Sequence, residues 1–413
     1  MKLKEKFYQF LRWTEKYTKT DMVYFFEGSF WWILGRFFSF LASFLILFSF
    51  AKFAEKEVYG AFQYVISIVA MAGIFCLPGI DTALVRAVAK RKELTFFLCQ
   101  KEKLKFATFT FFISFVISLY YFFKKNFELA FSFFVAGIFF PLISIFSLYL
   151  PFWQGRKRFD LQNKYFIFHN LLAALLISLI IFLKPKLTFV IFGYYLAFTF
   201  ATFIFYQITK KKIKKETEKD KETISFGKHL TIMAFPTLIS NQIDKVILWQ
   251  IIGPVPLAIY SFALRIVERM RQFIPFSILA FPKMSQINLK ERKKDIFKKF
   301  LKLFLISFPL TIIYILICPI FFKIFFPTYL ASVVYSQALA LILIFSPFSF
   351  LGTSLLALAK KRELYILNFL PQILKIILFF VLIPLFEIWG GVISILISQT
   401  FHSILIFYFF KKI

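Results

Sequence analysis

The sequence has 413 residues, of which 60% are hydrophobic and 66 are Phe, and its mean hydropathy is +0.76. Average soluble domains are about 45–50% apolar, so this composition excludes a soluble globular protein and indicates an integral membrane protein. The formal net charge of +30 does not indicate a nucleic-acid partner, because the Lys and Arg residues lie between long apolar runs. No phosphate-binding glycine loop, metal-ligand cluster or nucleophile motif is present, so we expect no cofactor, no metal and no enzymatic activity.

Long apolar runs follow one another along the whole chain. A helix needs about 20 apolar residues to cross a hydrocarbon core of about 30 Å, and this rule predicts twelve transmembrane helices. The predicted fold class is therefore an all-α integral membrane protein. The spans are predicted at 24–50, 58–80, 104–123, 129–151, 165–183, 187–208, 231–252, 257–281, 301–322, 334–357, 364–386 and 390–410.

The basic residues alternate between the predicted loops. The segments 1–21, 81–105, 209–228 and 282–300 are rich in Lys and Arg, whereas the connections between them, such as 253–256, carry few or none. Basic loops are retained on the cytoplasmic side of a membrane. We therefore expect a multi-pass protein of the cytoplasmic membrane, with both termini in the cytoplasm and contacts to anionic membrane lipids.

A highly charged segment divides the chain into two similar halves. The prediction is an N-terminal six-helix bundle over 1–208, a charged cytoplasmic linker over 209–230 and a C-terminal six-helix bundle over 231–413. Tyr59-Gly60 and Tyr260-Ser261 stand at corresponding points, just after the first predicted hairpin turn of each half. Repeats of this kind are typical of transporters, so we expect two bundles around a central cavity.

Charged residues interrupt the seventh and eighth predicted spans. Asp244 and Lys245 lie on the seventh, and Arg265, Glu268 and Arg269 lie on the eighth. A charge near mid-membrane costs about 2.5–3.5 kcal/mol on insertion scales, so such residues usually face a protein interior, a partner or a water-filled path. The rise per residue places Asp244 about 20 Å and Arg265 about 12 Å from the starts of their spans, which is a similar depth on two antiparallel helices.

Two interpretations of these charges remain open. Asp244 and Glu268 could form internal salt bridges with neighbouring Arg residues, or they could couple transport to an ion. The cations outnumber the acids, which favours an anionic ligand, and the planar fork of Arg suits phosphate. Two further cations are predicted near mid-membrane, so the candidate substrate-binding residues are Arg36, Lys245, Arg265, Arg269 and Lys375.

Several segments resemble a known family. AEKEVYGAF and GIDTALVRAVAKRKE in the first half, and ISNQIDKVILWQIIGPVPLAIYSFALRI in the second, resemble the polysaccharide flippases of the multidrug/oligosaccharidyl-lipid/polysaccharide exporter superfamily. The resemblance implies that the chain moves an undecaprenyl-diphosphate-linked oligosaccharide, such as an O-antigen unit of lipopolysaccharide, between leaflets by alternating access. It also implies coupling to H⁺ or Na⁺ and cooperation with other polysaccharide-assembly proteins.

Two other functions stay open at this point. A multidrug or cation antiporter of the same superfamily would share the twelve spans, but the excess of Arg disfavours cationic drugs. A membrane-embedded O-antigen polymerase or ligase would need a sizeable outer loop, and the predicted outer connections are at most about a dozen residues.

Overall fold

The computed structural model describes residues 22–214, 218–272, 293–358 and 360–412. Every regular element within these residues is a helix. Four sequence predictions lie wholly or partly outside the described residues: the basic segment 1–21, residues 215–217 of the charged linker, the end of the eighth span at 273–281, and most of the basic loop that follows it.

The first half contains eight α-helices and one 3₁₀ helix among the described residues. They are α2 (Met22–Phe53), α3 (Lys56–Ala72), η1 (Gly73–Cys76), α4 (Gly79–Ala89), α5 (Thr95–Phe123), α6 (Phe127–Phe146), α7 (Tyr149–Gly155), α8 (Phe159–Leu183) and α9 (Leu187–Lys210). The second half contains α10 (Glu222–Ser240), α11 (Ile243–Ile252), α12 (Pro254–Gln272), α14 (Lys293–Phe325), η2 (Pro327–Tyr329), α15 (Ser332–Ala340), η3 (Leu341–Phe345), α16 (Phe348–Ala357) and α17 (Lys361–Lys411).

Within the described residues, eight helices are long and apolar enough to cross a membrane, or nine if the bent pair Ser332–Phe345 and Phe348–Leu356 counts as one span. The chain is thus an all-helical, multi-pass membrane protein. The chain reverses direction within α17 at Glu387, whose φ of 51° and ψ of −125° are not helical. A straight helix of its length would measure about 75 Å, far more than a bilayer core. The two legs of α17 match the predicted spans 364–386 and 390–410.

Several predicted spans are broken within their length. Within the span predicted at 58–80, α3 and η1 end just before Leu77, which has a left-handed φ of 52° and precedes Pro78. The chain then continues as α4. The span predicted at 231–252 breaks between α10 and α11 at Asn241 and Gln242. The prediction of a cytoplasmic loop over 81–105 is therefore largely wrong, because α4 and the start of α5 contain most of these residues.

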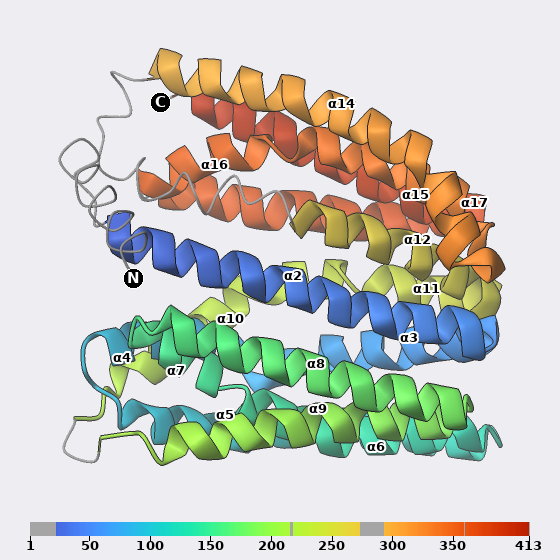
Figure 1. The fold of residues 1–413 in the computed structure, drawn as a ribbon, viewed down its shortest axis with the longest axis horizontal. Helices are drawn as coiled ribbons and strands as arrows, with labels where there is room; N and C mark the ends of the chain where they lie inside the picture. The colour runs from blue at the N-terminus through green and yellow to red at the C-terminus, as the bar shows by residue number, and fades with distance from the viewer. Residues whose placement is uncertain (1–21, 215–217, 273–292, 359, 413) are drawn as a thin grey trace, which may run out of the picture.

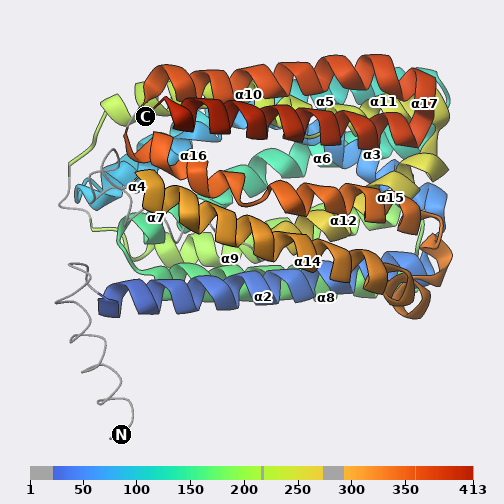
Figure 2. The ribbon, with the colours of Figure 1, turned by 90° about the horizontal axis from the view of Figure 1, so that it is seen from above.

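The helices run roughly side by side, and the chain reverses at two opposite ends of the molecule (Figures 1 and 2). We call the end where α2 begins and α17 ends the terminal face, and the opposite end, with the α2–α3 and α8–α9 turns, the hairpin face (Figure 1). Helix α2 packs along α8, α5 packs on α6, and α6 packs on α9. In the second half α17 packs against α10, α11 and α16.

Buried apolar side chains link the two halves at the hairpin face. Among the described residues, the largest cluster includes Tyr59 and Phe62 of the first half together with Tyr260, Phe262 and Tyr329 of the second. Two smaller clusters pack near the terminal face. The buried members of one run from Leu77 to Tyr206 of the first half and include Ile213 of the linker, and Ile224 of α10 packs against them. Those of the other, from Ile296 to Phe410, belong to the second half. The halves therefore share their largest core at the hairpin face and have mainly separate buried clusters near the terminal face.

Two close helix crossings join the halves. At the hairpin face, a Cβ added to Gly60 on α3 would lie 2.0 Å from the carbonyl oxygen of Pro254, the first residue of α12. The Tyr64 ring stacks on the Trp249 ring with centroids 4.5 Å apart, next to this crossing. Nearer the terminal face, the backbone N–H of Gly79 donates to the Thr231 hydroxyl at 3.0 Å where α4 crosses α10. The absence of a side chain at both glycines lets the backbones approach this closely.

Candidate functional site

A cavity between the halves holds two of the predicted cations. Arg265 and Arg269, one turn apart on α12, line it together with polar side chains of α3, α8 and α9, namely Gln63, Asn170 and Tyr194. The remaining wall is mainly apolar and comes from α2 and its neighbours. The cavity volume is about 130 Å³, below the about 300–1,000 Å³ typical of small-molecule sites. In this conformation the site is too small for a glycan.

Arg36 joins this pair from the first half. It lies on α2, its guanidinium carbon is 5.3 Å from the centre of the Trp32 ring, and its side chain is half-buried. Arg36, Arg265 and Glu268 are all within electrostatic range of Arg269. Arg36 does not line the cavity, but Arg269 has a cation of each half, Arg36 and Arg265, within electrostatic range. Glu268 is the one carboxylate so placed among the described residues. We call Arg36, Arg265 and Arg269 the arginine cluster.

The predicted pairing of Asp244 with Arg265 is not formed. The Asp244 carboxylate is buried, with 1% of its surface exposed, and its Oδ2 accepts a hydrogen bond of 2.6 Å from the Tyr260 hydroxyl. Its Oδ1 is also buried and accepts no hydrogen bond from the described residues. Asp244 points into the second half, toward Tyr260, whereas Arg265 points toward Tyr59 and Tyr194 of the first.

Lys245 and Lys375 lie apart from the arginine cluster, contrary to the prediction of one shared cation site. The Lys245 Nζ donates to the backbone oxygen of Asn241 at 3.1 Å and to the Gln242 side chain at 3.0 Å. The Lys375 Nζ donates to Asn241 Oδ1 at 3.2 Å and is within electrostatic range of Asp244. Neither lysine lines the cavity of Arg265 and Arg269. Asp244, Asn241 and the two lysines thus form a second polar group, inside the second half.

Glu268 lies between these two groups. Its side chain is exposed, and it is within electrostatic range of Arg265, Arg271 and Lys375. No ion pair within 4.0 Å to Glu268 is found among the described residues. The predicted salt bridge of Glu268 with a neighbouring Arg is therefore not closed in this conformation.

Sequence reasoning missed a buried ion pair in the first half. Lys103 on α5 is 1% exposed, and its Nζ lies 2.6 Å from Asp81 Oδ1 on α4 and 3.3 Å from the carbonyl oxygen of Ser144. The prediction placed both residues in a cytoplasmic loop because RAVAKRKE is strongly basic. The signal available in the sequence was the run IDTALVRAVA, whose apolar residues recur at helical spacing.

We expect Asp81→Asn to destabilise the protein strongly, because it leaves the buried Lys103 ammonium without its counter-charge. Removing one partner of a buried pair costs about 3–5 kcal/mol, and the partial exposure of Asp81 favours the lower end. Thermal unfolding in detergent would measure the loss. Asp160→Asn is the matched control, because its exposed pair with Arg158 is worth about 0–1 kcal/mol. An equal effect of the two variants would contradict the assignment, as would a failure of Lys103→Met to restore stability to Asp81→Asn.

The start of the predicted linker is fixed to the terminal face of the first half. Arg156 Nε donates to Glu93 Oε1 at 2.8 Å, and Arg156 Nη2 donates to the carbonyl oxygen of Lys212 at 2.8 Å. The backbone N–H of Lys214 also donates to Glu93. Burial acts to raise the pKa of Glu93, but the hydrogen bonds from Arg156 and Lys214 outweigh it and lower that pKa. The carboxylate therefore stays ionised near neutral pH and retains this contact.

Comparison with known families gives one extended match. The family model for polysaccharide biosynthesis proteins matches residues 25–288. This range extends from the first turn of α2 past the end of α12 and includes the arginine cluster and Asp244. A search of curated protein sequences finds no match.

Solved structures share the fold. An inward-facing multidrug resistance MATE-family transporter of the MOP superfamily is 12% identical, with a TM-score of 0.60 over 91% of this chain and 94% of that chain. The lipid II flippase MurJ, in an inward closed conformation, is 14% identical, with a TM-score of 0.61 over 92% and 87%. A MOP-superfamily transporter from Pyrococcus furiosus is 14% identical, with a TM-score of 0.57 over 93% and 94%. At these identities the likeness shows the fold alone.

Proposed function

Since the chain belongs to the polysaccharide biosynthesis protein family, a family of membrane transporters rather than enzymes, we propose that it is a flippase for undecaprenyl-diphosphate-linked oligosaccharide. It moves the lipid-linked glycan across the cytoplasmic membrane for surface polysaccharide synthesis, with an O-antigen unit of lipopolysaccharide as the example substrate. The glycan carries two phosphates at its lipid junction, so its transfer through hydrocarbon requires an internal site that offsets the negative charge.

The observation that carries the proposal is the arginine cluster between the two halves. Arg36 comes from the first half and Arg265 and Arg269 from the second, so a diphosphate bound among them contacts both. Arg binds phosphate oxygens through two parallel N–H donors. Gln63, Asn170 and Tyr194 line the same cavity and offer hydrogen bonds to sugar hydroxyls.

The packing of the halves supports the proposal of alternating access. The shared core at the hairpin face and the cavity of about 130 Å³ describe a conformation that is closed toward that face and too small for a glycan. Loading and release then require the halves to separate alternately at the two faces. The proposed topology has twelve spans, with α10–α11, α12 and the two legs of α17 each crossing the membrane, both termini in the cytoplasm and the hairpin face outside.

Transport of a fluorescent undecaprenyl-diphosphate oligosaccharide in proteoliposomes tests the function directly. We expect the purified protein to expose the glycan on the opposite leaflet without changing its chain length. Polymerisation or ligation of the glycan without translocation would contradict the proposal in favour of an enzyme. Efflux of cationic drugs without glycan transport would favour the multidrug antiporter.

Asp244 is the proposed coupling residue for H⁺ or Na⁺. Its carboxylate is buried, has one oxygen without a hydrogen bond from the described residues, and lies within electrostatic range of Lys375. We expect Asp244→Asn to remove the dependence of glycan transport on the H⁺ or Na⁺ gradient, because the amide cannot bind either cation in the same way. Glu268, exposed between the two groups, is the second candidate.

Tyr260→Phe is the matched control for this prediction. It removes the hydrogen bond to Asp244 but keeps the carboxylate, so ion dependence should persist. If Asp244→Asn and Tyr260→Phe lower transport equally and both retain ion dependence, Asp244 has only a structural role. Transport rates at several gradients, in vesicles with equal protein content, distinguish these results.

A further inference from the structure

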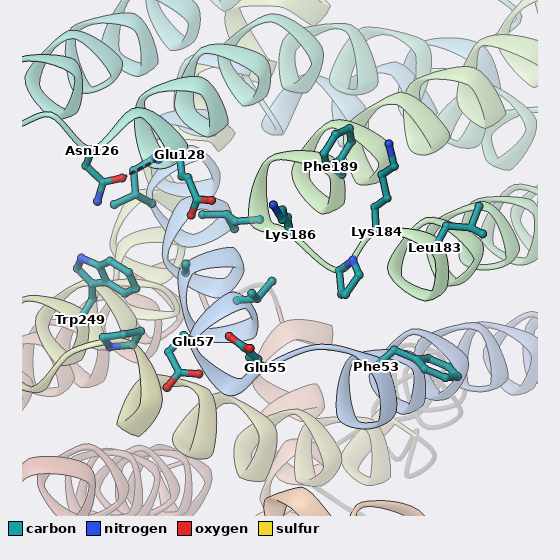
Figure 3. A pocket seen from close by; sticks show the side chains of 16 residues that line it. Phe53, Glu55, Glu57, Asn126, Glu128, Leu183, Lys184, Lys186, Phe189 and Trp249 are labelled. Atoms are coloured by element: carbon teal, nitrogen blue, oxygen red, sulfur yellow. Dashed lines mark hydrogen bonds between the residues drawn. The ribbon is translucent and has the colours of Figure 1, made fainter.

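The hairpin face contains a larger cavity that the transport site does not use. Its volume is about 840 Å³, within the range of small-molecule sites. Three turns of the first half enclose it, those between α2 and α3, α5 and α6, and α8 and α9, and Trp249 and Pro254 of the second half complete its wall. Figure 3 shows these segments around one open space.

The cavity is lined by charges of both signs from different elements. Glu55 comes from the α2–α3 turn, Glu57 from the first turn of α3 and Glu128 from the start of α6, whereas Lys184 and Lys186 come from the α8–α9 turn (Figure 3). All five side chains are exposed. Within the part of the chain that the structure describes, none of these five residues forms an ion pair with an N–O distance up to 4.0 Å. The ion pairs found among the described residues are Lys103–Asp81, Arg156–Glu93, Arg158–Asp160 and Lys228–Glu102. The carboxylates on one wall of the cavity and the ammonium groups on the other therefore do not contact each other directly.

This pattern restricts the chemistry of a ligand. A simple anion is repelled by three carboxylates, and a simple cation is repelled by two ammonium groups. A neutral sugar can form hydrogen bonds with either wall, but it carries no charge that complements them. A ligand with a positive and a negative group complements both walls at once.

The apolar rim indicates where the ligand comes from. Leu183 and Phe189 beside the lysines are 64% and 44% exposed, and the Lys184 Nζ lies 4.8 Å from the centre of the Phe189 ring. Exposed apolar side chains next to lysines are typical of the boundary between lipid tails and headgroups. The cavity thus opens at the level of the membrane surface.

We propose that this cavity binds a zwitterionic phosphate–ammonium group, the chemistry of ethanolamine phosphate, either as a lipid headgroup or free in solution. The lysine wall takes the phosphate, and the glutamate wall takes the ammonium. Because Pro254 and Trp249 also form the contact between the halves through Gly60 and Tyr64, an occupied cavity stabilises the conformation closed at the hairpin face. This site is independent of the diphosphate site, and its test needs no transport measurement.

Binding to the purified full-length protein tests the proposal with two probes. Calorimetry measures ethanolamine phosphate, and native mass spectrometry compares retention of phosphatidylethanolamine with that of phosphatidylglycerol. We expect Glu57→Gln/Glu128→Gln and Lys184→Gln/Lys186→Gln each to weaken binding on the order of tenfold or more, since each removes one of the two charge complements. Glu222→Gln/Lys323→Gln is the matched control, because both residues are exposed and outside the cavity, and it should bind as the parent does.

The two probes separate the sources of the ligand. Selective retention of phosphatidylethanolamine, lost in both wall variants, assigns a lipid headgroup. Binding of ethanolamine phosphate without lipid selectivity, again lost in both wall variants, assigns a soluble zwitterion. Equal binding of inorganic phosphate and ethanolamine phosphate would overturn the proposal, as would unchanged binding in either wall variant or no binding of either probe.

Discussion

Replacing Arg265 and Arg269 together by Ala is expected to abolish glycan transport while the protein still accumulates in the membrane. Each Arg offers charge-assisted hydrogen bonds to a phosphate, worth about 1.5–3 kcal/mol. Loss of one Arg should lower the transport rate about ten- to hundredfold, and loss of both should lower it at least about hundredfold. The measurement is the initial rate of glycan exposure in proteoliposomes, with surface polysaccharide in cells as a second readout.

Two controls show whether charge or geometry matters. Lys at either position keeps the charge but loses the planar fork, so Arg265→Lys and Arg269→Lys should retain intermediate activity. Arg271 lies on the same helix but does not line the cavity, so Arg271→Ala should change the transport rate little. Normal transport by the double Ala variant, at normal protein level, would remove the arginine cluster as the substrate site.

Gly60→Ala is expected to prevent closure at the hairpin face. The added Cβ would lie 2.0 Å from the backbone oxygen of Pro254, and a backbone atom cannot rotate away as a flexible side chain can. The halves must separate there, so the conformational equilibrium shifts away from the structure described here. Because alternating access needs both closures, we expect a transport rate below about a tenth of the parent rate, the effect of a population shift exceeding about 1.4 kcal/mol.

Cysteine accessibility reports the separation. Ala258 is buried and stands four residues after Pro254 on the same face of α12, and the native Cys76, Cys99 and Cys318 are buried. A membrane-impermeant maleimide should label Ala258→Cys only when Gly60→Ala is also present. Gly352→Ala is the matched control, since its Cβ would meet only Ile406 at 3.6 Å. Unchanged labelling and transport in Gly60→Ala would show that this crossing does not gate access.

The sequence predicted an all-helical membrane protein and the positions of its apolar segments, because the length of an apolar run reports directly on membrane thickness. Helix starts were less accurate, since α5 begins at Thr95 and α14 at Lys293, before the spans predicted from 104 and 301. Breaks were harder to predict. Pro78 follows Leu77 and marks the end of η1, but the span rule joined this segment to α3 and treated α4 as a loop. Helix α4, with its Arg86 and Asp81, packs on α10, α7 and α5. A short helix packed on protein need not have the composition of a spanning helix, so a rule based on apolar length does not find it.

The charged residues of the candidate site were predicted, but not the directions of their side chains. Asp244 and Arg265 were expected to face each other or one cavity, whereas Asp244 bonds to Tyr260 and Arg265 lines a cavity that Asp244 does not reach. The turn at Gly253, with φ 89°, separates α11 from α12, and spacing along one helix does not fix the rotation of the next. The polar partners Gln63, Asn170 and Tyr194 each stand alone in an apolar span, so only the fold brings them together with Arg265 and Arg269.

The two crossings between the halves have different mechanical roles in the proposed transport cycle. Gly60 and Gly79 are about 28 Å apart along the chain axis at helical rise, and the left-handed Leu77 interrupts the helix between them. If the contact of Gly79 with Thr231 acts as a fulcrum, a rotation of about 10° there moves the Gly60 end by about 5 Å. A small angular change near one face is thus enough to part the aromatic contacts at the other, without unpacking either half.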